Sequence, residues 1–245
     1  MNNKNNKKNI LVIIPARSGS KRIPNKNIRQ FLGKPLIAYT IKQALSLKFV
    51  ERVIVDTDSP KIAKIARQYG AEVPFLRPAH LAKDTSHIVY SILYALKRLK
   101  KEENYVPSYI MILQTTSPLR KIQDIKACWK LMKSTKATTV LTICPTHPRL
   151  YYLRKNNDIF LVNGSEKRSS NTQAWPPAYI LNGCFVYIME TKSLLEEKLV
   201  ITKKTKAVIC SKWRSIDLDV REDWVIAEIL YKNRQLIKKR IKNFK

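Results

Sequence analysis

Short, almost wholly apolar segments alternate with amphipathic segments along most of this chain, and that alternation limits the folds open to it. Ile10–Pro15, Arg52–Asp56 and Tyr109–Leu113 have the continuous apolar character of strands that are buried on both faces. Apolar residues at helical spacing occur in Leu36–Leu47, Ser59–Tyr69, Ser86–Glu103 and Ile122–Met132. The pattern predicts an α/β fold in which helices cover both sides of a mostly parallel sheet.

Two stretches depart from this alternation and set the predicted domain organisation. Residues 1–9 are polar and basic, and we expect them to form a disordered tail. Between about residues 145 and 181 the alternation gives way to short β-like pieces and turn signals such as Asn163-Gly164. We therefore predict one domain over residues 10–245, with an inserted β-rich arm at about 145–181 and a closing helix from about Arg221.

Composition narrows the class of protein. The chain has 245 residues, of which 44% are hydrophobic, enough for a sizeable core. No apolar run approaches the roughly 20 residues of a membrane helix, and the polar start is unlike a signal peptide. We expect a cytoplasmic protein with no membrane contact. The four cysteines form no CxxC pair and resemble neither a zinc site nor a disulfide framework, which favours structural roles.

The charge balance is strongly basic. Lys and Arg number 47 against 18 Asp and Glu, for a formal net charge of +29. Such an excess favours binding to nucleic acid or another polyanion. The cations are spread over nearly every predicted surface, however, and aromatic residues are not interleaved with them as a base-stacking platform requires. The sequence therefore disfavours nucleic acid as the main partner.

The loop Ala16–Asn27 is the first candidate site. Ligands of open α/β sheets bind at the carboxyl ends of strands, and this loop directly follows the first predicted strand. Arg17, Lys21 and Lys26 carry the charge to surround phosphates, and Ser20 offers a hydroxyl donor. The loop matches neither the Walker A nor the GxGxxG pattern. On charge alone, a solvated basic loop is an equally good interpretation.

Asp217 and Asp219 are the second candidate site. Alternation along a strand would turn both carboxylates to the same face. Two hard oxygen ligands close together suit Mg²⁺ that is shared with substrate phosphates. An isolated DxD pair is also common on protein surfaces, so the pair needs support from elsewhere in the chain.

The loop sequence PARSGSKRIPNKN resembles the signature of the acylneuraminate cytidylyltransferases. These are the CMP-sialic acid synthetases and their relatives that act on other nine-carbon (nonulosonic) sugar acids, including legionaminic and pseudaminic acid. Further pieces follow in the family's order: GKPLIAYTI at 33–41, VIVDTDS at 53–59, GAEVPFLRPAHLAKDTS at 70–86, LQTTSPLR at 113–120, LNG at 181–183 and SIDLD at 215–219. The resemblance spans about residues 10 to 235.

The resemblance implies a Rossmann-like nucleotidyltransferase sheet and a role for each motif residue. The CTP-binding residues would be Arg17, Ser20, Lys21, Lys26, Asn27 and Gln114. Gln114 and Asn182 would contact the sugar acid, and Asp217 and Asp219 would bind Mg²⁺. Arg17, Lys26 and Asp217 would be catalytic, with Asp217 or a metal-bound water as the base.

The implied reaction joins CTP to a nonulosonic acid and releases pyrophosphate. The resemblance also implies a homodimer in which the arm reaches the partner. Two alternatives stay open. One is a cytidylyltransferase for another keto-sugar acid such as the eight-carbon Kdo. The other is a basic protein that binds nucleic acid or another polyanion on an inactive nucleotidyltransferase scaffold.

Several positions depart from the family pattern, mostly on the sugar side. Thr115 stands where the family usually has proline. Tyr187 falls one position late, which on a strand reverses its face and takes it away from the sugar. Arginines expected near the sugar carboxylate are replaced by Asn171, Thr172 and Ile180, and Lys167 or Arg168 would have to compensate. Arg22 falls at a variable position and is interpreted as a surface charge.

Overall fold

A computed structural model of the chain describes residues 9–153, 155, 157–162, 175–183 and 185–244. The tail predicted at residues 1–9 lies outside the described residues except for Asn9. The Asn9 side chain accepts a hydrogen bond from the Ser108 backbone N–H at 2.7 Å, which attaches this residue to the start of β5.

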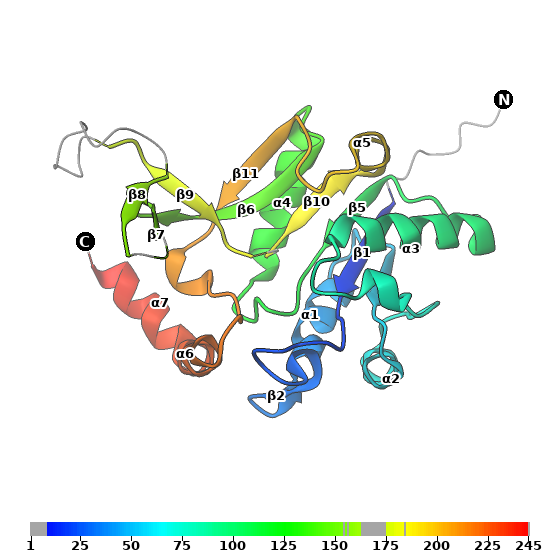
Figure 1. Cartoon of the computed structure of the whole chain (residues 1–245), viewed down its shortest axis with the longest axis horizontal. Coiled ribbons are helices and arrows are strands. Elements are labelled where there is room, and N and C mark those ends of the chain that lie inside the picture. The colour runs from blue at the N-terminus through cyan, green and yellow to red at the C-terminus, as the bar shows by residue number, and fades with distance from the viewer. Residues whose placement is uncertain (1–8, 154, 156, 163–174, 184, 245) are drawn as a thin grey trace.

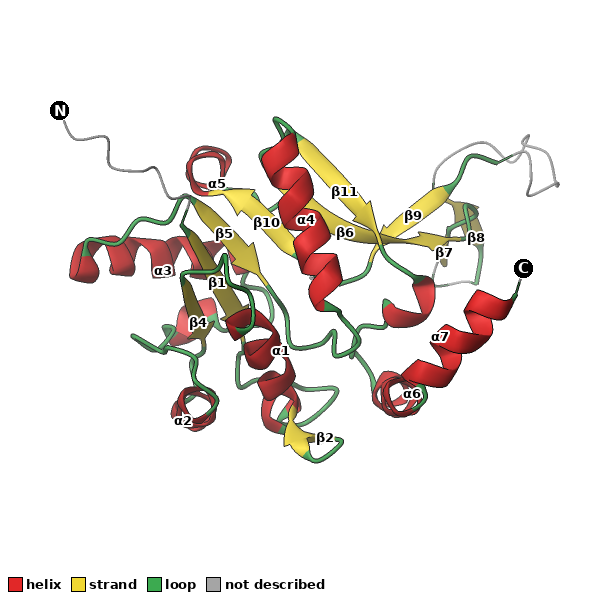
Figure 2. Ribbon diagram, turned by 180° about the vertical axis from the view of Figure 1, so that it is seen from behind, coloured by secondary structure: helices red, strands yellow, loops and turns green. Residues whose placement is uncertain are grey.

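The centre of the fold is a seven-stranded sheet (Figures 1 and 2). The strands of the chain are β1 (Ile10–Pro15), β2 (Gln30–Phe31), β3 (Lys34–Pro35), β4 (Arg52–Asp56), β5 (Tyr109–Ile112), β6 (Thr139–Thr146), β7 (Tyr151–Leu153), β8 (Ile159–Leu161), β9 (Ala178–Leu181), β10 (Tyr187–Glu190) and β11 (Thr205–Ile209). Along the sheet they run β11-β6-β10-β5-β1-β4, and β9 pairs with β6. β1 is parallel to β4 and β5, and β6 is parallel to β11. β10 is antiparallel to both of its neighbours, and β9 is antiparallel to β6. The other five strands of the sheet run in one direction, so the sheet is mostly parallel, as predicted.

Helices cover both faces of this sheet. The α-helices of the described chain are α1 (Leu36–Leu45), α2 (Pro60–Gln68), α3 (Ile88–Glu103), α4 (Ile122–Ser134), α5 (Thr191–Glu197), α6 (Arg221–Lys232) and α7 (Arg234–Asn243). Figures 1 and 2 show α3 on one face and α1 and α4 on the other. No helix in the described part of the chain has the length and apolar character needed to cross a membrane.

The buried strand β1 explains why its sequence is apolar throughout. Val12 and Ile14 pack in the cluster that contains α1 and α4, whereas Leu11 and Ile13 pack in the cluster that contains α3. Successive side chains of a strand point to opposite faces, so two covered faces require apolar residues at every position. All four side chains are fully buried.

Local signals place α2 as predicted. The Ser59 hydroxyl accepts a hydrogen bond from the Ile62 backbone N–H at 3.3 Å, and Pro60 occupies the first turn. The helix ends at Gln68, and Gly70 takes φ +92°, a left-handed conformation that favours glycine.

A third, smaller core cluster brings the C-terminal part of the chain to the loop after β1. Phe31, next to the β2–β3 turn, packs edge-on against Trp224 of α6, with ring centroids 5.5 Å apart. Leu218 is fully buried in the same cluster. Burial of a side chain of this size is worth about 1.5–3 kcal/mol. This packing holds residues 215–219 beside the loop that follows β1.

The predicted arm is built from β-structure at one end of the molecule (Figure 1). β6 continues beyond its pairing with β10 and pairs antiparallel with β9, from Ile143 opposite Leu181 to Thr146 opposite Ala178. β7 and β8 form a separate two-stranded antiparallel sheet. Residues 163–174 of the arm lie outside the described residues.

The buried cysteines carry a first prediction. Cys128 and Cys210 are free and buried, and burial raises the pKa of Cys210 to about 12 and that of Cys128 as well. Because the thiolate is the reactive form, neither thiol should react with iodoacetamide at about pH 8 in the folded protein. Peptide mass spectrometry should find both modified only after unfolding in denaturant. Rapid alkylation of either cysteine in the native protein would contradict their placement.

Candidate active site

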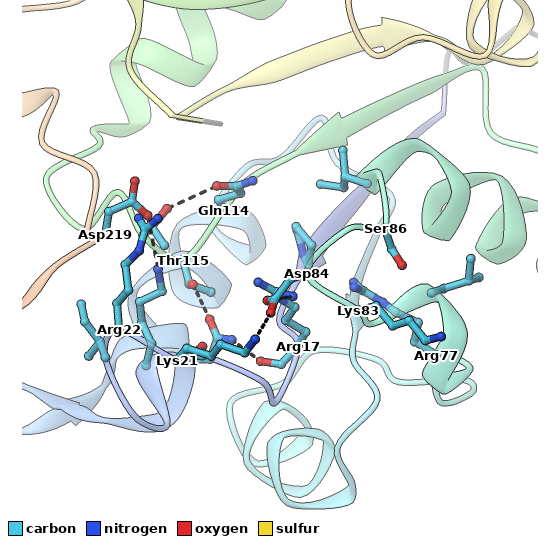
Figure 3. A pocket seen from close by; sticks show the side chains of 18 residues that line it. Arg17, Lys21, Arg22, Arg77, Lys83, Asp84, Ser86, Gln114, Thr115 and Asp219 are labelled. Carbon is cyan, nitrogen blue, oxygen red and sulfur yellow. Dashed lines mark hydrogen bonds and ion pairs between the residues drawn. The ribbon is translucent and has the colours of Figure 1, made fainter. Parts of the chain in front are cut away.

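A cavity of about 550 Å³ opens at the carboxyl ends of β1, β4 and β5 (Figure 3). This is the edge at which open α/β sheets bind ligands. Six cationic side chains and two carboxylates line it: Arg17, Lys21, Arg22, Lys26, Arg77, Lys83, Asp84 and Asp219. Ser20, Asn27 and Gln114 line it as well. The site therefore suits a small, highly charged anion.

Hydrogen bonds to distant residues fix the loop between Pro15 and Ile28. The Ser18 backbone N–H and hydroxyl both donate to the Asp58 carboxylate, at 2.8 and 2.5 Å. Asn27 is buried, and its amide nitrogen donates to the Arg17 carbonyl at 2.9 Å. Its amide oxygen accepts from the Thr115 hydroxyl at 2.6 Å. Both ends of the Asn27 amide thus have protein partners that hold Arg17 in place.

The Thr115 contact explains a departure from the family pattern. A proline at this position would have no hydroxyl to donate to Asn27. Thr115 is buried at the end of β5, and its hydrogen bond joins that end to the loop after β1. Threonine at this position therefore supplies a hydrogen bond between the two loops that line the cavity.

Arg17 and Lys21 share one carboxylate. The Arg17 guanidinium lies 2.7 Å from Asp84 Oδ1, and Lys21 Nζ lies 2.6 Å from Asp84 Oδ2. Arg17 also donates to the Ala82 carbonyl at 3.4 Å. The three charged side chains are 37, 81 and 44% exposed for Arg17, Lys21 and Asp84, so solvent and ligands can reach them.

Lys26 connects the loop to the aspartate segment. Its ammonium donates to the Leu218 carbonyl at 2.6 Å and lies 3.9 Å from Asp219 Oδ1. Burial lowers the pKa of Lys26, although Asp219 and Asp217 oppose that shift by favouring the charged form. The cation is thus held where a phosphate group between the loop and the aspartates would meet it.

The prediction of a strand through Asp217 and Asp219 is wrong. Residues 215–219 have no regular secondary structure. The Asp219 backbone N–H turns back to the Asp217 carbonyl at 3.0 Å and is also bound by the Asp223 carboxylate at 2.9 Å. Asp223 accepts a second bond from the Val220 N–H and so caps α6. These bonds take the donors that a strand ladder would have used.

The two aspartates nonetheless fit a metal that is shared with a substrate. Asp219 is exposed and lines the cavity. Asp217 is partly buried, and its Oδ1 is a buried atom that has no hydrogen-bond partner among the described residues. Burial raises the pKa of Asp217, although the Thr116 hydroxyl and Lys26 favour its ionised form. An unsatisfied buried carboxylate oxygen is costly, and a cation would satisfy it.

Gly183 makes room for Asp217. A Cβ at this position would lie 2.6 Å from an Asp217 carboxylate oxygen, closer than van der Waals contact allows, and Gly183 has φ +63°. No group of three or more His, Cys, Asp or Glu side chains able to hold a metal occurs within the described ranges. A metal held by Asp217 and Asp219 would therefore take its other ligands from substrate phosphates and water, as Mg²⁺ does.

Asn182, which the resemblance assigns to the sugar acid, is not among the residues that line this cavity. It is buried, with its amide oxygen 3.0 Å from the Thr142 hydroxyl and its amide nitrogen 3.1 Å from the Ser215 hydroxyl. Asn182 thereby ties β6 to the start of the aspartate segment. Tyr187 is buried in the core cluster that contains α3.

Comparison with known proteins identifies the family of the chain. The cytidylyltransferase family model matches residues 11–209. The chain belongs to the cytidylyltransferase family. It is 36% identical to the CMP-N,N'-diacetyllegionaminic acid synthase of Legionella pneumophila, over 90% of this chain and 95% of the relative. It is 32% identical to the pseudaminic acid cytidylyltransferase of Campylobacter jejuni, over 91% of this chain and 96% of the relative.

Solved structures of cytidylyltransferases share the fold. The structure of CMP:2-keto-3-deoxy-manno-octonic acid synthetase in complex with CTP superposes with a TM-score of 0.68. It covers 92% of this chain and 99% of its own, at 15% sequence identity. At an identity this low, the superposition shows the shared fold alone, and that fold is the predicted nucleotidyltransferase architecture.

Three cations that line the cavity were not assigned to the site from the sequence. Arg22, interpreted as a surface charge, lines the cavity, as do Arg77 and Lys83 (Figure 3). Arg77 is buried and makes a paired contact with the Asp56 carboxylate, at 3.0 and 2.6 Å. Their position after the second predicted strand, Arg52–Asp56, was the signal that could have indicated Arg77 and Lys83. The carboxyl end of that strand lies at the same edge of the sheet as the carboxyl end of the first strand.

The buried side chain of Arg120 holds the backbone at Gln114. Arg120 donates to the Gln114 carbonyl at 3.1 Å and to the Phe185 carbonyl at 2.7 Å. The Gln114 side chain lines the cavity, and its amide oxygen accepts from the Thr116 hydroxyl at 3.3 Å. Of the substituted arginine positions, Asn171 and Thr172 lie outside the described residues, as do Lys167 and Arg168. Ile180 lies on β9 and is 42% exposed.

Proposed function

We propose that this cytidylyltransferase-family chain transfers CMP from CTP to a nonulosonic acid, giving the CMP-sugar and pyrophosphate. The observation that carries the proposal is the convergence of Arg17, Lys21 and Lys26 with Asp219 in one cavity. Cations surround the space that a triphosphate requires, and a carboxylate pair lies beside it. The names of the relatives at 32 and 36% identity supply the substrate class.

In the proposed complex, Arg17, Lys21 and Lys26 hold the triphosphate, with Ser20 as a further donor. Arg17 can make bidentate contacts, whereas the lysines act as point charges. Gln114 lies at the end of β5 within reach of ligands in the cavity, and we assign it to CTP and the sugar acid. Asn27 supports Arg17 from beneath, so its contribution to CTP binding is through the loop.

The reaction needs little beyond positioning and charge stabilisation. The anomeric 2-hydroxyl oxygen of the acceptor forms a bond to the α-phosphorus, and the bond from that phosphorus to the pyrophosphate oxygen breaks. The hydroxyl proton passes to Asp217 or to solvent. Lys26 and Arg17 meet the negative charge that grows on the phosphate oxygens. Mg²⁺, held by Asp217 and Asp219, would neutralise further phosphate charge.

Asn182 takes a positioning role in this proposal. Its bonds to Thr142 and Ser215 hold the start of the segment that carries Asp217 and Asp219. An effect of changing Asn182 should therefore be seen in the Mg²⁺ requirement as well as in the KM for the sugar acid.

A panel of acceptors tests the activity and its substrate together. The chain would be incubated with CTP, Mg²⁺ and, separately, N,N'-diacetyllegionaminic, pseudaminic, N-acetylneuraminic and eight-carbon Kdo acids, and the products would be analysed by mass spectrometry. We expect a CMP-sugar from at least one nine-carbon acid. A CMP adduct with Kdo alone would instead support the eight-carbon alternative.

We further propose a homodimer formed through the arm. Large apolar side chains are exposed on β7, β8, β9 and α6: Tyr151, Tyr152, Leu153, Ile159, Tyr179, Ile180, Leu181, Val225, Ile226 and Ile229. Exposed apolar surface of this extent is typical of a protein interface. Light scattering at assay concentration should give twice the 28.5 kDa chain mass. The mass of a single chain would refute the dimer.

Substrate supply favours the cytoplasm as the site of action. CTP is a cytoplasmic metabolite, and we therefore propose that the chain acts there. Cell fractionation should recover the protein with cytoplasmic markers, and recovery with the membrane fraction would contradict this placement.

A further inference from the structure

The position of Asp84 suggests a role that the proposed reaction does not use. Two carboxylates line the cavity, and they face different cations. Asp219 lies beside Lys26, whereas Asp84 places one oxygen 2.7 Å from Arg17 and the other 2.6 Å from Lys21 (Figure 3). A single carboxylate therefore satisfies two of the three cations that we assign to the triphosphate.

The fold does not depend on these two ion pairs. Arg17, Lys21 and Asp84 are all more than a third exposed, and exposed ion pairs contribute little to stability. The surrounding segment has other attachments: the Ser86 hydroxyl donates to the His80 carbonyl at 2.8 Å, and buried Arg77 is paired with Asp56. The Asp84 contacts can therefore be exchanged for a ligand without unfolding the loop.

A phosphate group offers Arg17 and Lys21 the same chemistry as this carboxylate. Both present negatively charged oxygens to N–H donors, but a triphosphate carries more charge and reaches more of the cations at once. Arg17 and Lys21 cannot keep their contacts with Asp84 and give the same N–H groups to phosphate oxygens.

We propose that Asp84 is an internal competitor of the triphosphate, which occupies Arg17 and Lys21 in the nucleotide-free protein and is displaced when phosphates bind. This inference rests on the proposed function. Its consequence is weaker binding of both CTP and pyrophosphate, so that the product leaves more readily. Displacement also releases the Arg17 contacts with Ala82 and Asp84, which couples the phosphate site to the segment 81–84 that lines the cavity.

Isothermal titration calorimetry on the full chain tests this role. The probes are CTP, inorganic pyrophosphate and inorganic tripolyphosphate, applied to wild type, Asp84→Asn and Glu196→Gln. Glu196→Gln is the control, because it makes the same charge change on α5. This helix follows the last residue of β10, which pairs with the first residue of β5, so it begins at the edge of the sheet opposite to the cavity. We expect Asp84→Asn to bind all three probes about fivefold tighter at low salt, as removal of two exposed ion pairs predicts, and Glu196→Gln to match wild type.

Two further measurements sharpen the result. The gain should shrink as salt screens the charges, and it should shrink in a Lys21→Ala background, where one of the two contacts is already lost. Equal or weaker binding of tripolyphosphate by Asp84→Asn would overturn the inference, since weaker binding would mean that Asp84 orients the cations for phosphate. Failure of wild type to bind CTP, with tripolyphosphate binding still sensitive to Asp84, would instead count against the proposed function alone.

Discussion

Replacing Asp217 by asparagine should lower Mg²⁺-dependent turnover about 10³-fold, because a metal that neutralises phosphate charge is worth several kcal/mol in the transition state. Asp219→Asn should likewise abolish most of the activity. Both substitutions keep the size of the side chain, so the amide introduced by Asp217→Asn would still fit against Gly183. Steady-state kinetics over a range of Mg²⁺ concentrations measures the effect.

Two readouts separate loss of the metal site from loss of the fold. Burial raises the pKa of Asp217, which means that its ionised form is disfavoured in the folded protein. The neutral amide should therefore leave the metal-free Tm unchanged or higher. Glu222→Gln removes an exposed charge from the first turn of α6 and should retain wild-type kinetics. Normal turnover of Asp217→Asn at ordinary Mg²⁺ would refute the assigned role.

Replacing Lys26 by alanine should lower kcat about 10²–10³-fold, in line with the loss of one preorganised donor to developing charge. The lysine is 17% exposed and bonded to the Leu218 carbonyl, so it needs no reorganisation to meet a phosphate group. Stopped-time assays of pyrophosphate release at saturating CTP measure this change. Lys34→Ala, at an exposed position in the β2–β3 hairpin, is the matched control.

The Lys26 substitution also tests the link between the two halves of the site. Loss of the Leu218 contact removes one of the bonds that hold the aspartate segment, so the Mg²⁺ concentration needed for half-maximal activity should rise together with the fall in kcat. Kinetics indistinguishable from wild type would remove Lys26 from the site.

Much of the fold follows from local patterns in the sequence. The segment RVIVD forms a strand with the predicted bounds, Arg52–Asp56, because burial on both faces leaves a continuous apolar run. The Ser59 cap and Pro60 place the start of α2 for equally local reasons. For the segment IDLDV at residues 216–220, the local pattern predicted a strand that the structure does not contain. It alternates like a strand, but capping by Asp223 and burial of Leu218 decide its conformation.

The location of the candidate site was also predictable from the sequence, but several contacts within it were not. The rule on strand ends brought Arg17, Lys26 and Gln114 to one cavity. The side chains of Asn27 and Asn182 accept hydrogen bonds from the hydroxyls of Thr115 and Thr142, which lie 88 and 40 residues away in the sequence. No local sequence pattern encodes these contacts. Family motifs identify such residues without revealing whether they touch the ligand or hold the residues that do.

Release of pyrophosphate from CTP is the most direct test of the proposed activity. The chain would be assayed with Mg²⁺ and either N,N'-diacetyllegionaminic or pseudaminic acid, with each component omitted in turn. We expect pyrophosphate to form in equal amount to a CMP-sugar, and only when CTP, Mg²⁺ and the acid are all present. No release above the acceptor-free background with any nonulosonic acid, together with steeply salt-dependent binding to nucleic acid, would contradict the account and favour a polyanion-binding protein.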